Sequence, residues 1–169
     1  MIYPVVKYGN PVLDRPAEPV TQFDAELEKL VADMFETMYA AHGVGLAGPQ
    51  IGISKRLCTI DITSEQDPSA KIVLVNPVII STESKQTEEE GCLSLPTFRA
   101  PTSRPLKASV RAQDIHGQEI TLSGEGLLAR AFCHEVDHLN GTLFIHHLSV
   151  LKRDSIRRRV KKMVKAGEW

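Results

Sequence analysis

Apolar residues between Asp24 and Gly43 recur at intervals of three and four positions, which is the spacing of one face of an α-helix. Asp24 can accept hydrogen bonds from the first backbone amides as an N-cap, and Gly43 is a natural stop. The pattern therefore predicts an amphipathic helix whose apolar positions are Leu27, Leu30, Val31, Met34, Phe35 and Met38.

Glycine and proline dominate the next segment, from Gly43 to Gly52, and are too frequent there for a helix or a central strand. We expect an exposed loop of defined shape. Beyond it, β-branched and alternating residues predict extended segments, and the turn residues Asp114, His116 and Gly117 favour an antiparallel hairpin between the last two. The predicted strands are 56–62, 71–80, 83–95, 105–113 and 119–123.

Two more helices are predicted in the carboxy-terminal third, over 125–140 and 149–166. Strands grouped together and flanked by helices are typical of an α+β fold with antiparallel sheets, not of a βαβ alternation. The length of 169 residues suits a single catalytic domain over 1–169, because a chain of this size can bury a substantial core.

Charge is distributed unevenly along the chain. The net charge is -1, yet the segment from Lys152 to Trp169 carries eight Lys or Arg against Asp154 and Glu168. One interpretation of this surplus of positive charge is a solvated helix face. The other is a surface attracted to a polyanion such as RNA.

No apolar stretch approaches the ~20 residues that a membrane-spanning helix requires. Lys7, Asp14 and Arg15 interrupt the amino-terminal segment, which has no resemblance to a signal peptide. Three widely spaced cysteines do not indicate a disulfide framework. We therefore expect a cytoplasmic protein with no membrane partner.

The most informative motif is H-E-x-x-H, at His134 to His138. Residues four apart on a helix point the same way, so His134 and His138 can bind one metal ion with Glu135 beside it. Leu127 and Ala131 fall on the same face and could leave a pocket next to the metal.

A catalytic metal site usually has a third protein ligand. The downstream candidates fail, because Phe144 stands where a metzincin has its third histidine and the only later glutamate is Glu168. Upstream, Cys92 is the best candidate, since a thiolate suits a borderline metal. Cys58 is better explained as a core residue, and Cys133 points away from the two histidines.

Three motifs together resemble the signatures of the peptide deformylase family. Gly43 to Gln50 is similar to G-x-G-L-A-A-x-Q, Glu90 to Ser94 matches E-G-C-L-S, and His134 to His138 matches H-E-x-D-H. The one departure is Gly48, where the family usually has alanine. We expect this difference to change the stiffness of the loop more than its chemistry.

The resemblance implies an enzyme that removes the formyl group from the amino-terminal formylmethionine of new polypeptides. It implies antiparallel sheets packed around a central helix that carries the H-E-x-x-H motif. It also implies one metal ion held by Cys92, His134 and His138, typically Fe²⁺, with Zn²⁺ or Ni²⁺ as substitutes. Glu135 would act as the general base on the attacking water.

The resemblance also suggests how the substrate is bound. Gln50 and the backbone N–H of Leu93 would stabilise the negative charge that develops on the formyl oxygen. Backbone groups of the first motif would hold an extended peptide, and two residues of the motif helix would line the methionine pocket. The residues assigned to peptide binding are Val44, Gly45, Leu127 and Ala131.

Two other classes of protein remain open at this point. One is an H-E-x-x-H metallopeptidase of another type, which the missing downstream ligand disfavours. The other is a binding module with a structural metal and a functional basic helix. The basic segment could also serve the enzyme itself by bringing it to ribosomal RNA, where formylated chains emerge.

Overall fold

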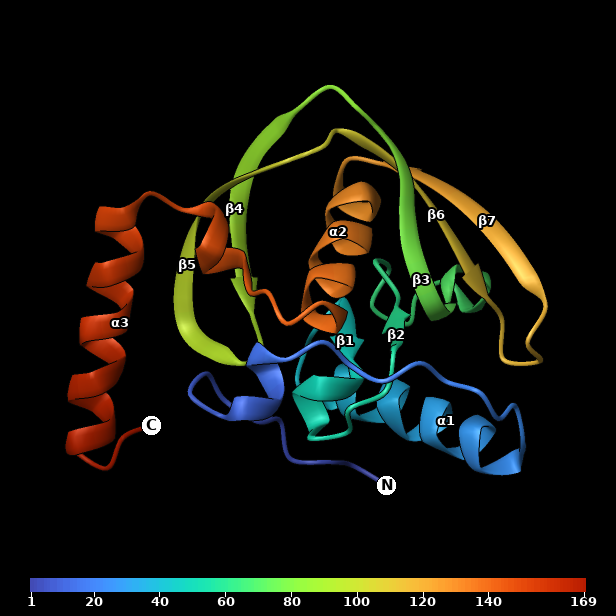
Figure 1. The fold of residues 1–169 in the computed structure, drawn as a ribbon, viewed down its shortest axis with the longest axis horizontal. Coiled ribbons are helices and arrows are strands. Elements are labelled where there is room, and N and C mark those ends of the chain that lie inside the picture. Colours follow the sequence, from blue (N-terminus) through green and yellow to red (C-terminus); the bar gives the residue numbers. More distant parts are fainter.

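The computed structural model describes residues 1–169 and places one helix at the centre of an α+β fold, with strands on both of its sides (Figure 1). No helix is both long and apolar enough to cross a membrane. The helices are α1 (Ala25–Ala40), α2 (Leu127–Leu139) and α3 (Val150–Lys165). The strands are β1 (Gly45–Ala47), β2 (Leu57–Ile60), β3 (Ile72–Glu83), β4 (Gln86–Cys92), β5 (Leu95–Arg104), β6 (Lys107–Gln113) and β7 (Glu119–Glu125).

The strands form two antiparallel sheets. Five strands pair in the order β1-β2-β3-β6-β7, and β4 pairs with β5 alone. The helix α2 lies between these sheets, α1 lies below them and α3 lies beyond β5 (Figure 1). The expected α+β class with a central helix is confirmed, as is the antiparallel pairing of β6 with β7.

The sequence prediction did not include the strand β5. The strand β5 contains Pro96 and Pro101, and proline lacks the N–H that a central strand needs. The structure tolerates both prolines because β5 has a partner on one side only, β4. On one side of an edge strand the backbone N–H groups have no neighbouring strand to bind, so a missing N–H there costs no hydrogen bond within the sheet.

The expectation of an exposed loop from Gly43 to Gly52 was wrong. This segment contains the edge strand β1 and a 3₁₀ helix (Gly48–Ile51), and Leu46 to Ile51 are buried. Its backbone polar groups find partners inside the protein, as in the hydrogen bond of 2.8 Å from the Val6 N–H to the Gln50 carbonyl. Burial of an irregular segment is possible because these groups are satisfied.

Gly48 allows a close backbone contact within this segment. A Cβ at this position would lie 2.7 Å from the Lys55 carbonyl oxygen and 2.9 Å from that of Ile53. Both neighbours are backbone atoms, which cannot move as a side chain can. Gly48 therefore affects packing directly, and not only loop stiffness as the sequence suggested.

The apolar back of α2 packs on the five-stranded sheet and holds the helix in place. Phe132 is completely buried there with Leu74 and Val110 from two of the strands. A separate cluster attaches α3 to β5 through Ile156 and Val160. The polar front of α2 is left facing β4 and the first motif.

Candidate active site

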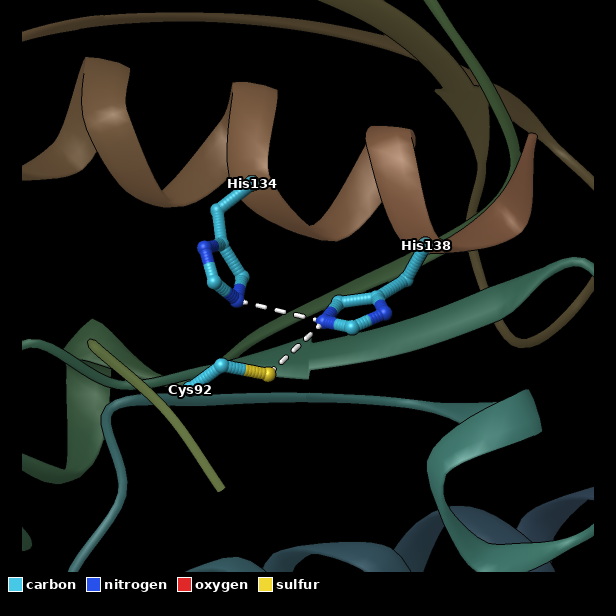
Figure 2. A group of neighbouring side chains, drawn as sticks. All are labelled: Cys92, His134 and His138. Carbon is cyan, nitrogen blue, oxygen red and sulfur yellow. Dashed lines mark hydrogen bonds between the residues drawn. The ribbon is translucent and has the colours of Figure 1, made fainter. Parts of the chain in front are cut away.

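The structure brings Cys92, His134 and His138 together, although Cys92 lies more than forty positions before the histidines. Figure 2 shows both imidazole rings projecting from α2 toward the cysteine. The Nε2 atom of His138 lies 3.2 Å from Cys92 Sγ and 3.2 Å from His134 Nε2. All three donor atoms lie within 4.8 Å of one another.

This arrangement fits a bound metal ion. Donors that share one tetrahedral ion at ordinary bond lengths are about 3.3–3.6 Å apart, close to the separations seen here. Burial keeps the pKa of His138 well below its usual value, which favours the neutral ring that a metal ligand needs. Its Nδ1 is buried without a hydrogen-bond partner.

The surroundings of His134 favour a positive charge. Burial alone would lower the pKa of His134, but the charge of Glu135 and hydrogen bonds with Cys92 and Glu90 outweigh it and raise the pKa well above its usual value. An environment that favours a cation at this ring also favours a metal cation beside it.

Glu90 fixes the orientation of His134. The ring donates from Nδ1 to Glu90 Oε2 over 2.7 Å, which leaves Nε2 directed at the other two donors. Glu90 is itself held by Arg104 through two hydrogen bonds, of 3.0 and 2.7 Å, and by Arg130 at 2.7 Å. Burial would raise the pKa of Glu90, but its hydrogen bonds with His134 and Arg104 hold it well below the usual range.

This ion-pair network reaches the surface. Arg104 donates to Asp137 over 2.6 Å, and the half-exposed ring of His147 lies 2.7 Å from the same carboxylate. Sequence reasoning missed Arg104 and Arg130 because neither belongs to a motif, although Arg130 lies only four positions before His134 on α2. Glu90 could have been recognised from the sequence, because it is part of the second motif, but it had no assigned role.

Glu135 lies beside the three donors and is buried. Burial raises the pKa of its carboxyl group to about 7, because a charged carboxylate is poorly solvated there. Its Oε1 atom has no hydrogen-bond partner. A Cβ on Gly45 would lie 2.9 Å from Glu135 Cδ and closer still to its Oε2, so the absence of a side chain at position 45 makes room for this carboxylate.

Gln50 is also buried. From the sequence alone, it could equally have been an exposed amide on the surface. Its Oε1 accepts a hydrogen bond of 3.0 Å from the Ala47 N–H. Its Nε2 is thereby directed toward the second motif, 3.2 Å from Ser94 Oγ and 3.5 Å from Cys92 Sγ. The fixed amide thus presents N–H donors next to the three donor atoms.

A groove with a volume of about 470 Å³ runs beside these residues. The residues that the sequence assigned to peptide binding all line it, as does Leu93. Leu127 is half exposed at its edge, and Ala131 is buried. The Val44 carbonyl accepts a hydrogen bond of 2.8 Å from the Asp61 N–H and is therefore already engaged.

The two remaining cysteines lie outside the cluster. Cys58 is completely buried in the core between α2 and the sheet, as expected for a small apolar residue. Cys133 belongs to the same core, and burial raises the pKa of its thiol to about 11. Both are free thiols.

A helix-borne pair of histidines, a cysteine and a glutamate beside an open groove define a metal-dependent hydrolase. Comparison with known proteins gives the particular family. A sequence model described as polypeptide deformylase matches residues 2–154. The peptide deformylase of Acidobacterium capsulatum is 59% identical over 169 residues, covering 100% of this chain and 99% of that protein.

Solved structures agree with the sequence match. The crystal structure of a peptide deformylase from Legionella pneumophila is 44% identical, with a TM-score of 0.91 over 99% of this chain and 98% of that one. The peptide deformylase of Thermus thermophilus gives 39% identity and a TM-score of 0.89, again over 99% and 98%. The chain belongs to the peptide deformylase family.

Its activity follows from this membership. The protein is a metal-dependent hydrolase that removes the N-formyl group from the amino terminus of newly synthesised polypeptides. The alternative of a different H-E-x-x-H peptidase and that of a binding module are both replaced by this assignment.

Proposed function

We propose that Cys92, His134 and His138 hold the metal for deformylation and that Glu135 is the general base. The observation that carries this proposal is the buried, unpartnered Oε1 of Glu135 beside three converging donor atoms. An unpaired buried carboxylate oxygen is costly unless a ligand or water completes it.

The native metal in this proposal is Fe²⁺, one per chain. A thiolate and two imidazoles suit Fe²⁺, Zn²⁺ and Ni²⁺ alike, so the last two are expected as substitutes. When bound, the metal supplies Lewis acidity to the formyl group and to water. Metal analysis of protein purified without oxygen is the test, and a preparation fully active with zinc alone would contradict the assignment of iron.

Glu135 moves the proton in this mechanism. Its carboxylate accepts a proton from the attacking water and later delivers it to the departing amine. Burial raises the pKa of this carboxyl and a bound cation would lower it, and this balance suits a group that takes up and releases a proton. The groove beside Glu135 gives the formyl group access to it.

Gln50 and the backbone N–H of Leu93 stabilise the charge on the formyl oxygen. The support for Gln50 is its orientation, since the Ala47 N–H holds Oε1 and leaves Nε2 facing Cys92. Donors that are fixed before the reaction stabilise developing charge without reorganising. Leu93 follows Cys92 directly and lines the same groove.

The peptide lies along the groove between β1 and β4. Both are edge strands, so an extended peptide can form backbone hydrogen bonds with them. The proposed partners are the Gly45 backbone on β1 and the N–H of Val44, the residue before this strand. Leu127 and Ala131 form the methionine pocket on α2.

The test of the mechanism is formate release from a formyl-Met peptide, measured together with metal content. Glu135→Ala should keep the metal but lose nearly all turnover. A Glu135→Ala protein with normal turnover would overturn the role of this residue while leaving the family assignment intact.

The basic helix α3 is proposed to bring the enzyme to ribosomal RNA in the cytoplasm. Its exposed cations support this, since a cluster of positive charge on one helix attracts a polyanion. Lys161→Glu and Lys162→Glu should weaken co-sedimentation with ribosomes and reduce its salt dependence. Leu151→Ala, an exposed apolar change on the same helix, is the control, and equal binding of all variants would rule the contact out.

A further inference from the structure

One wall of the groove is a segment with an unusual backbone. Residues 95–99, at the start of β5, all line the groove. Thr97 in this segment has a φ of +72°, in the left-handed region. A β-branched residue rarely adopts that conformation, and it persists only where the surrounding structure enforces it.

Phe98 is the residue through which the carboxy-terminal part of the chain contacts this wall. Its ring is almost completely buried. The ring of Trp169 packs against it edge-on, with centroids 6.1 Å apart and an interplanar angle of 63°. The Arg159 guanidinium lies 4.9 Å from the centre of the same Phe98 ring, in a cation–π contact.

A second connection runs through the backbone near the amino terminus. The indole N–H of Trp169 donates to the Tyr8 carbonyl over 2.9 Å. The Tyr8 N–H donates to the Ser94 carbonyl over 2.8 Å, and Ser94 Oγ accepts a hydrogen bond of 3.2 Å from Gln50 Nε2. Trp169 therefore contacts the wall directly at Phe98, and the Tyr8 backbone connects it to Ser94, the residue before the wall.

Two of the contacting residues lie beyond the end of the match to the family model. The matched residues end at 154, so Arg159 and Trp169 come after them. Neither residue is near the catalytic helix in sequence, and α3 packs on β5 and not on α2 (Figure 1). His134, a proposed metal ligand, is held separately, by Glu90 and its arginines.

We propose that Trp169 is a positioning residue for the substrate: it fixes the 95–99 wall so that this wall binds the peptide residues that follow formylmethionine. The proposal rests on the proposed function of the groove. Because Trp169 holds the wall and not the metal ligands or Glu135, its loss acts on peptide binding and leaves the chemical step in place.

The first test compares kinetics on a short and a long substrate. In Trp169→Ala, KM for formyl-Met-Ala-Ser should rise about fivefold or more while kcat stays within about twofold, and formyl-Met-Ala should be less affected. Trp169→Phe keeps an aromatic ring against Phe98 and should recover most of the binding. Val164→Ala, an exposed change on α3, is the control and should behave as the wild type.

The second test uses the intact wall. Trp169 is the only tryptophan in the chain, so emission excited where tyrosine does not absorb comes from this residue alone. Titration of metal-loaded Glu135→Gln with formyl-Met-Ala-Ser should change the emission to saturation, with a midpoint near the wild-type KM. The double variant Glu135→Gln/Phe98→Leu should show a smaller change in emission when the peptide binds.

The outcomes separate the two proposals. Three results would each overturn the role of Trp169. The first is an unchanged KM in Trp169→Ala, and the second is a fall in kcat as large as the rise in KM. The third is Trp169 emission that does not change at saturating peptide. If Trp169→Ala fails to fold, the fluorescence titration decides alone. Rapid hydrolysis of the peptide by Glu135→Gln would instead contradict the proposed general base.

Discussion

Nδ1 of His134 and Oε2 of Glu90 lie 2.7 Å apart, so a residue of the second motif orients a proposed metal ligand of the third. Such partners fix the tautomer and direction of a ligating histidine. Glu90 is in turn enclosed by Arg104 and Arg130. The geometry of the donor cluster therefore depends on a carboxylate outside it.

Glu90→Gln should weaken metal binding about 10- to 100-fold, measured by competition with a chelator, because the amide cannot replace the charge. It should also lower stability, since removing one member of a buried ion pair costs about 3–5 kcal/mol. Glu89→Gln is the matched control: this neighbour is exposed and lies 3.7 Å from Arg99. Equal metal affinity in both variants would contradict the prediction.

Gly45→Ala should lower kcat for formyl-Met peptides at least about tenfold, because the new methyl group would displace the Glu135 carboxylate. Metal content, measured on the same sample, should stay at one per chain, since the donors lie elsewhere. Normal turnover would mean that the loop or Glu135 can shift at little cost.

Gln50→Ala should lower kcat about 10²–10³-fold if its Nε2 stabilises the formyl oxygen. Gln50→Glu keeps the shape but places a negative charge there, and should be no better. Steady-state formate release measures both variants, with melting curves to check the fold. A rise in KM without loss of kcat would assign Gln50 to substrate binding instead.

Gly48→Ala should reduce the free energy of unfolding by about 1–3 kcal/mol, the usual cost of overpacking. The reason is the approach of the new Cβ to two backbone carbonyl oxygens. Denaturant titration measures the change. Stability equal to the wild type would show that this segment adopts the alanine-containing backbone of the family motif without strain.

Acid should destabilise the protein through Asp61. Burial would raise the pKa of this carboxyl, but hydrogen bonds from Tyr39 and Thr63 outweigh it and lower the pKa to about 2. The folded pKa is below the unfolded value of about 3.9, so the stabilisation is complete above pH 4 and is lost as the pH falls toward 2.

Asp61→Asn should therefore be less stable than the wild type at pH 7, with a difference that shrinks between pH 4 and pH 2. Thermal melts across this range measure it. Asp154→Asn serves as the control at pH 7, because this carboxylate is about half exposed and lies 3.9 Å from Arg157. A constant difference at every pH would contradict the assignment.

The sequence by itself determined the elements whose causes are local. The spacing of apolar residues gave α1, and the i, i+4 spacing placed His134 and His138 on one helix face with Glu135 beside them. The three motifs together indicated the family. Each of these inferences depends on residues that are close together in the sequence, so the order of residues is enough to make it.

Only the tertiary structure decided the contacts between distant segments. It placed Cys92 against the histidines, buried the glycine-rich segment that the sequence predicted to be exposed, and put proline-containing β5 at a sheet edge. It also joined Trp169 to Phe98. These relationships depend on which surfaces meet when the chain folds, and burial and pairing at those surfaces override local preference.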